Sequence, residues 1–219
     1  MRATAPALAV TLCLAALVPA PDAQPKAPLT REQALADMGK PDVEARRQAT
    51  AWLGELGMMA DAPVLLRALR DADEVVRALA EHSVWQVWSR SGDAEVDALF
   101  QIGLEQMKEG AAGAAIETFT AIIEKKPDFA EGWNKRATIY FMVGEYEKSL
   151  RDCGEVVKRN PEHFGVLSGY GQIYLALDEP ERALDYFQRA LKVNPNLGQV
   201  EAMVGELKRL IVERRKNTI

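Results

Sequence analysis

Large and small apolar side chains recur along the second half of the chain in a pattern that repeats every 34 residues, the spacing of Pro127, Pro161 and Pro195. Aligned on these prolines, three units place residues of matching size in four columns: Leu99, Trp133 and Leu167; Gly103, Ala137 and Gly171; Ala115, Ser149 and Ala183; Phe119, Cys153 and Phe187. Closely packed helices need a large residue opposite a small one. The pattern therefore predicts three stacked units, each a pair of helices joined by a turn.

Turn and cap signals support these units. Gly110 and Gly144 fall between the two helices of units one and two, where a left-handed residue is useful, and Asp178 takes that place in unit three.

A further helix is predicted after Pro195. Its apolar positions share one face, as in a terminal helix that shields the last repeat from water: Val200, Met203, Val204, Leu207, Leu210 and Ile211.

The repeated pattern resembles the tetratricopeptide repeat, with its positions for Trp or Leu, Gly or Ala, Tyr (Tyr140 and Tyr174), Ala, Phe and Pro. The match covers residues 93–195, and its three units agree in phase. The resemblance implies an all-α, right-handed solenoid whose first helices line a concave groove for peptides or partner helices. Residues 196–219 are then a capping helix and tail.

Residues 30–92 carry a weaker repeat. Thr30 and Gln33 form a capping box that opens a short helix, and the segment from Asp42 to Ala49 recurs from Asp73 to Ala80. This pattern resembles short HEAT-like repeats, which implies that these helices continue directly into the first tetratricopeptide unit. Arg46 and Arg77 are expected to form a ladder of ion pairs with the Asp caps of neighbouring repeats.

The first 23 residues read as a secretory signal peptide, with Arg2 before an apolar run from Leu8 to Val18. Residues 24–29 read as a linker. A cleaved leader implies a periplasmic or secreted protein. The alternative is an uncleaved leader that anchors a structural or regulatory subunit at the membrane, the one case in which membrane contact is expected.

Composition narrows the function. The chain has 219 residues and a net charge of −5, so it lacks the basic stripe typical of nucleic-acid binders. His82 and His163 have no second His or Cys at ligand spacing, which argues against a metal site, and no phosphate loop or nucleophile elbow is present. We expect no cofactor and no catalysis. Cys153 is expected to be a small buried hydrophobe.

The resemblance to tetratricopeptide repeats places partner contacts on the first helix of each unit. The positions that it implies are Phe100, Leu104, Met107, Glu131, Asn134, Thr138, Phe141, Met142, Ser168, Gln172 and Leu175.

Members of the family that bind cytosolic chaperones clamp the terminal carboxylate of their partner with Lys, Asn and Arg residues. This chain has Phe100, Leu104, Gly165 and Gly169 at those places, so no such clamp is expected.

The chain also resembles a group of small proteobacterial envelope proteins with tetratricopeptide repeats, around residues 133–136 and 163–165. This resemblance implies no activity.

The expected ligand is a protein or peptide segment held by hydrophobic side chains, with Asn134, Thr138 and Gln172 free to bond its backbone. The alternative is that the apolar groove positions of unit one pack on the N-terminal helices and leave a shorter groove. The partner's identity and the oligomeric state stay open.

Three further residues have expected structural roles. Arg136 falls in a column that is otherwise apolar, and we expect it to pair with Asp152 or Glu117 because an unpaired buried charge is costly. Trp85 and Trp88 lie on one helix face and are expected to pack between helices.

Overall fold

The computed structural model describes residues 29–217, which hold eleven α-helices, one 3₁₀ helix and no strand. The helices are α1 (Arg31–Asp37), α2 (Val43–Leu56), η1 (Met59–Asp61), α3 (Ala62–Ala68), α4 (Glu74–Trp88), α5 (Ala94–Lys108), α6 (Ala112–Lys125), α7 (Ala130–Met142), α8 (Tyr146–Arg159), α9 (Phe164–Ala176), α10 (Pro180–Val193) and α11 (Gly198–Asn217). The expected all-α repeat fold is confirmed. The predicted signal peptide and all but the last residue of the predicted linker lie outside the described residues.

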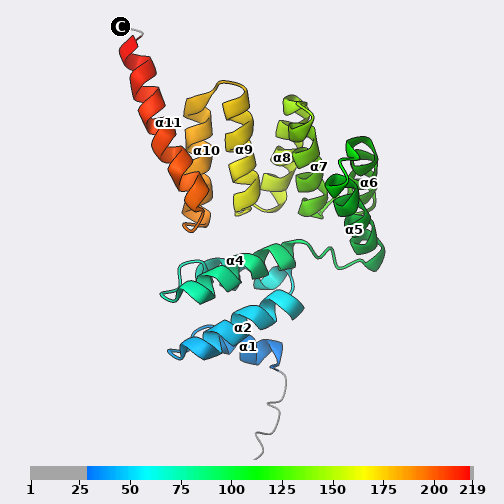
Figure 1. Ribbon diagram of the computed structural model, residues 1–219. Helices are drawn as coiled ribbons and strands as arrows, with labels where there is room; N and C mark the ends of the chain where they lie inside the picture. The colour runs from blue at the N-terminus through cyan, green and yellow to red at the C-terminus, as the bar shows by residue number, and fades with distance from the viewer. Residues whose placement is uncertain (1–28, 218–219) are drawn as a thin grey trace, which may run out of the picture.

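Three helix pairs, α5 with α6, α7 with α8 and α9 with α10, stand side by side as the 34-residue period predicts (Figure 1). The small-residue column explains how closely each pair packs. A Cβ atom added at Gly103 would lie 2.6 Å from the ring of Phe119, and one added at Gly171 would lie 2.5 Å from the ring of Phe187. No side chain larger than hydrogen fits at either position without a shift of the facing ring.

The turns within the three units have the predicted left-handed backbone. Gly110 and Gly144 have φ angles of 75° and 79°, and Asp178 adopts the same conformation with φ at 58°. Asp178 is the one residue other than glycine with positive φ in the described part of the chain, and its carboxylate lies 2.6 Å from the guanidinium of Arg214 in α11.

Helix α11 covers the last repeat, as expected. Val204, Leu207 and Ile211 are buried, and the first two join the cluster that contains Phe187 of α10. Leu210 departs from the predicted apolar face and is 37% exposed. The C-terminal end of α11 extends beyond α10 (Figure 1).

The N-terminal helices are capped as the sequence predicts. The Asp42 and Asp73 side chains accept hydrogen bonds at the starts of α2 and α4, and the Thr30 capping box is present. Arg46 pairs with the neighbouring Asp71 through two bonds of 2.8 and 2.9 Å, while the cap residue Asp73 is bound by Arg47.

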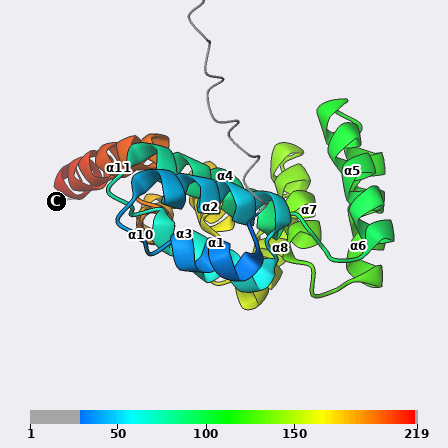
Figure 2. The ribbon, with the colours of Figure 1, turned by 90° about the horizontal axis from the view of Figure 1, so that it is seen from below.

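Helices α1 to α4 do not continue the stack onto α5. They lie across the lower ends of α9 and α10, while α5 and α6 stand clear of them (Figures 1 and 2). The expectation of one continuous solenoid is therefore wrong at this junction, and the HEAT-like resemblance stays a prediction. Arg77 shows the consequence: with no further repeat beside it, its guanidinium donates to the carbonyls of Asp71 and Ala72 instead of a neighbouring carboxylate.

Specific contacts hold the N-terminal helices against the third repeat. Phe164 belongs to the same buried cluster as Trp88. The Arg70 guanidinium donates to the carbonyls of Lys192 and Val193 at the end of α10. Asn196 then donates to the carbonyl of Leu69 at 2.7 Å. Across residues 29–217, no helix combines the length and the apolar character needed to cross a membrane.

Candidate functional site

A groove lies between α7 and α9, with α8 as its floor. It contains a cavity of about 70 Å³. The cavity is lined by Asn134, Ala137, Thr138, Phe141, Ser149, Cys153, Gly165, Val166, Gly169, Gln172 and Ile173. Gly169 lines this cavity, and a Cβ atom added there would meet no heavy atom within 4 Å. No residue in this lining carries a formal charge at neutral pH when Cys153 is protonated.

The structure brings four of the predicted groove residues together in this cavity: Asn134, Thr138, Phe141 and Gln172. Ser168 and Leu175 lie on the same helix as Gln172 but do not line the cavity. The Ser168 hydroxyl donates to the carbonyl of Phe164, and Leu175 packs against the core of repeats two and three.

The groove positions of repeat one are arranged differently. Phe100 is 1% exposed and packs edge-on against Phe119 and Phe129, so its assignment to the groove surface is wrong. Leu104 and Met107 pack against the same cluster. The alternative that these residues pack on the N-terminal helices is also wrong, because their partners come from repeat one, from Phe129 and from Ile139 of α7.

Met107 and Met142 meet in a second cavity of about 150 Å³ at the turn ends of α5 and α7. Met142 is 67% exposed. This cavity does not share a lining residue with the groove between α7 and α9.

Glu131 does not face a partner either, because it is completely buried. Its carboxylate lies 2.5 Å from His163 Nε2, accepts a 3.0 Å hydrogen bond from Asn134 Nδ2, and lies 3.3 Å from Lys135 Nζ. His163 Nδ1 accepts the backbone N–H of Val166 at 3.1 Å. That nitrogen therefore carries no proton, and the ring donates to Glu131 through Nε2.

These neighbours keep Glu131 ionised. Burial alone raises the pKa of a carboxyl group, but the hydrogen bonds from His163 and Asn134 and the charge of Lys135 outweigh it and hold the pKa of Glu131 below its usual value. Sequence reasoning missed this network because its residues come from two repeats. The sequence signal was His163, which stands directly before an apolar helix in a cap position.

Aromatic residues of α4 cover the network. The Trp88 ring stacks on His163 with centroids 4.4 Å apart, and Trp85 packs edge-on against both His163 and Phe164. The expected packing of these tryptophans between helices is confirmed, with Trp88 buried and Trp85 partly buried. Trp85 also reaches Gly165 at the end of the groove, where an added Cβ would overlap its ring. The N-terminal helices thus close one end of the groove and leave its middle open.

Other predicted contacts are also present. Arg136 forms the expected pair with Asp152, through bonds of 2.7 and 2.9 Å, and also donates to Thr120 of the preceding repeat. Cys153 is 3% exposed, as expected for a packing residue, and burial raises the pKa of its thiol to about 12. Residues 29–217 contain no group of three or more His, Cys, Asp and Glu side chains placed to hold a metal ion.

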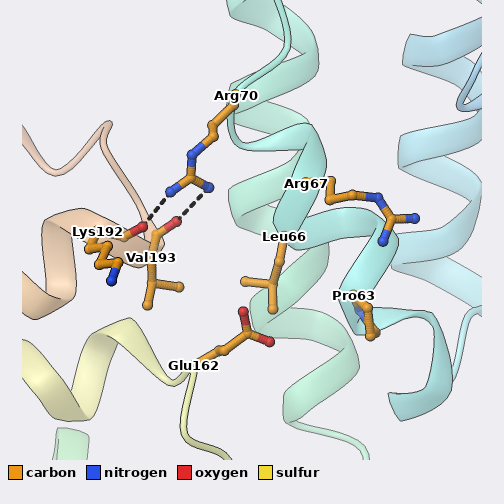
Figure 3. Close-up of a pocket in the computed structure, with 7 residues that line it drawn as sticks. All are labelled: Pro63, Leu66, Arg67, Arg70, Glu162, Lys192 and Val193. Carbon is orange, nitrogen blue, oxygen red and sulfur yellow. Dashed lines mark hydrogen bonds between the residues drawn. The ribbon is translucent and has the colours of Figure 1, made fainter.

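A cleft of about 410 Å³ follows the seam between the N-terminal helices and the third repeat. Figure 3 shows Arg70 reaching across it to the end of α10, with Glu162 on the opposite side and the Arg67 guanidinium turned away. The Arg70 guanidinium is used to bind two carbonyls, so this cleft is a joint between the two parts of the chain.

Comparisons with known proteins agree with the repeat assignment. Residues 171–197 match the family described as Tetratricopeptide repeat. A TPR repeat-containing protein of Rhizobium etli is 36% identical over 108 residues, which cover 49% of this chain and 53% of that protein. DnaJ homolog subfamily C member 3 of Gallus gallus is 29% identical over 104 residues, or 48% of this chain and 20% of that protein. The chain thus spans about half of the first relative and less of the second.

Two solved structures show the same fold. The first TPR domain of Spaghetti (RPAP3), bound to the HSP90 peptide SRMEEVD, superposes with a TM-score of 0.52 at 22% identity and covers 55% of this chain and 96% of that chain. The Sgt2 TPR domain of Aspergillus fumigatus gives a TM-score of 0.53 at 20% identity, covering 57% of this chain and 83% of that domain.

Proposed function

We propose that this tetratricopeptide-repeat chain is a non-catalytic module that binds an extended peptide segment of another protein in the groove between α7 and α9. The observation that carries the proposal is the open middle of this groove, where Gly169 leaves space beside Asn134, Thr138 and Gln172. The RPAP3 domain with the same fold was solved with a peptide bound. Because the groove exists before a partner arrives, binding does not incur the cost of ordering it.

Plugging the groove tests the proposal. The native chain is used to select binders from a library of random heptapeptides, and selected peptides are measured by fluorescence anisotropy. Gly169→Trp should fill the groove and weaken binding at least tenfold. Gly205→Trp is the matched control, because Gly205 also lies inside a helix with no atom within 4 Å of an added Cβ, but on α11.

Peptides that bind Gly169→Trp as tightly as the native chain would contradict the proposal and place the binding surface elsewhere. Circular dichroism of both variants checks that helix content is retained, so that a loss of binding reports on the groove.

For the place of action we propose the bacterial cell envelope, reached through cleavage of a signal peptide within residues 1–23. The support is the charge and apolar pattern of that segment. N-terminal sequencing of the protein recovered from a periplasmic extract should find a start close to residue 24. Recovery in the membrane fraction with Met1 intact would instead favour the anchored structural or regulatory subunit.

A further inference from the structure

The hydroxyl groups of the groove have already used their hydrogens. Thr138 Oγ1 donates to the carbonyl of Asn134 at 2.9 Å, and Ser149 Oγ donates to the carbonyl of Ala137 at 2.7 Å. A hydroxyl has one hydrogen and two lone pairs, so each of these groups has only acceptor capacity left for a ligand.

The side-chain amide of Asn134 also directs its acceptor oxygen to the groove. Its Nδ2 donates to Glu131, and an ionised carboxylate can only accept, so the nitrogen branch of the amide must face Glu131. The Oδ1 branch has no hydrogen-bond partner among the described residues and is not among the buried unpartnered atoms, so it is open to solvent on the groove side. Glu131 itself is held by His163, whose ring lies against Trp88.

Apart from the Gln172 amide, which can donate or accept, the polar groups that line the groove therefore present lone pairs, and none of them is charged. A carboxylate would meet acceptors with no cation in the lining to offset the repulsion. An ammonium would lose its hydration without gaining a countercharge, which is costly. A neutral N–H group meets neither penalty. The cavity of about 70 Å³ beside Ala137 and Ile173 leaves room for one small apolar side chain next to that donor.

We propose that the groove selects an uncharged N–H donor, the backbone amide of an extended segment next to a small apolar side chain, and that Glu131 is the positioning residue that sets this selectivity through Asn134. This inference rests on the proposed peptide-binding function and names the chemistry of its ligand. A groove with this selectivity differs from the clamp that holds the terminal carboxylate of a partner.

Three small probes of similar shape test the selectivity. N-acetylvaline N′-methylamide is neutral and has two N–H groups, its fully N-methylated analogue has none, and the N-acetylvaline anion ends in a carboxylate. Each is titrated into the ¹⁵N-labelled full chain while the Gly169 backbone amide and the Asn134 side-chain amide are followed by NMR. The first probe should bind about fivefold more tightly than either of the others, as expected for one added hydrogen bond.

Two variants test the residues. Thr138→Val keeps the shape of an exposed side chain and deletes one acceptor, so it should weaken only the N–H probe. Thr118→Val, in α6 outside the groove, is its control. Glu131→Gln frees the Asn134 amide to turn and should reduce the preference for the N–H probe over the carboxylate. If Glu131→Gln does not fold, Thr138→Val alone still tests whether the groove prefers the N–H probe.

Equal or tighter binding of the carboxylate or of the N-methylated probe would overturn this inference and leave the peptide-binding function in place. Failure of all three probes to shift the groove resonances would also overturn it. The proposed function fails separately, if Gly169→Trp binds selected peptides as the native chain does.

Discussion

Replacing His163 by Ala should be among the most destabilising single changes in this chain. The substitution removes the hydrogen bond to Glu131, the acceptor of the Val166 N–H, and the ring stacked on Trp88. Glu131 then stays fully buried with only Asn134 and Lys135 as partners. Removing His163 should cost about 3–5 kcal/mol in all, because a buried charged acceptor loses one of its hydrogen bonds and the missing ring leaves a cavity beside Trp88. We expect a loss in this range from the free energy of unfolding.

A double-mutant cycle isolates the pair. Glu131→Gln removes the charge, after which His163→Ala no longer strands a carboxylate. In the Glu131→Gln background, His163→Ala should therefore reduce the free energy of unfolding by about 2 kcal/mol less than in the native chain. A coupling of this size is typical of residues in direct contact. Urea unfolding at pH 7, followed by circular dichroism and tryptophan fluorescence, measures all four proteins. The reasoning would be refuted if the losses of unfolding free energy in the two single variants added up to the loss in the double variant. A loss below about 1 kcal/mol for His163→Ala would also refute it.

The same carboxylate predicts a pH dependence. The pKa of Glu131 in the folded chain lies below its reference value of 4.5. A group whose folded pKa is depressed contributes stability above its unfolded pKa and loses it as pH falls toward the folded pKa. As the pH falls below about 4.5, the native chain should therefore lose stability through this group. The difference between the native chain and Glu131→Gln should shrink over that range, and a constant difference would contradict the assignment.

Three further predictions concern packing, the turn of the third repeat and the buried thiol. Gly171→Ala should destabilise the chain by about 1–3 kcal/mol, measured by thermal unfolding, because the new methyl group meets the ring of Phe187. Asp178→Gly should raise stability by up to about 1 kcal/mol in urea unfolding, since glycine relieves the positive φ and the lost contact with Arg214 is solvent-exposed. Cys153 should react with a thiol reagent at pH 8 only as fast as the chain opens, because the thiol is buried and its pKa is about 12. Immediate labelling of the native chain would contradict that placement.

The sequence by itself determined the repeat architecture of this protein. The period of 34 residues, the Gly103 and Gly171 positions facing phenylalanines, and the glycines in the turns depend on residues close together in the chain, so their pattern can be read in one dimension. The same holds for the helix caps at Asp42 and Asp73. Four of the groove residues on α7 and α9 could be placed because the 34-residue alignment assigns them to the first helices of their repeats.

Only the tertiary structure decided where the N-terminal helices lie and which atoms the groove presents. The first depends on contacts such as Trp88 with His163 and Arg70 with the end of α10, between residues far apart in the chain and without a local pattern. The second depends on Glu131, whose position in the repeat resembles that of a groove residue. A buried carboxylate must be paired, and Glu131 finds its partners in His163 of the next repeat and Asn134 of its own helix. Glu131 therefore orients Asn134 instead of contacting a ligand.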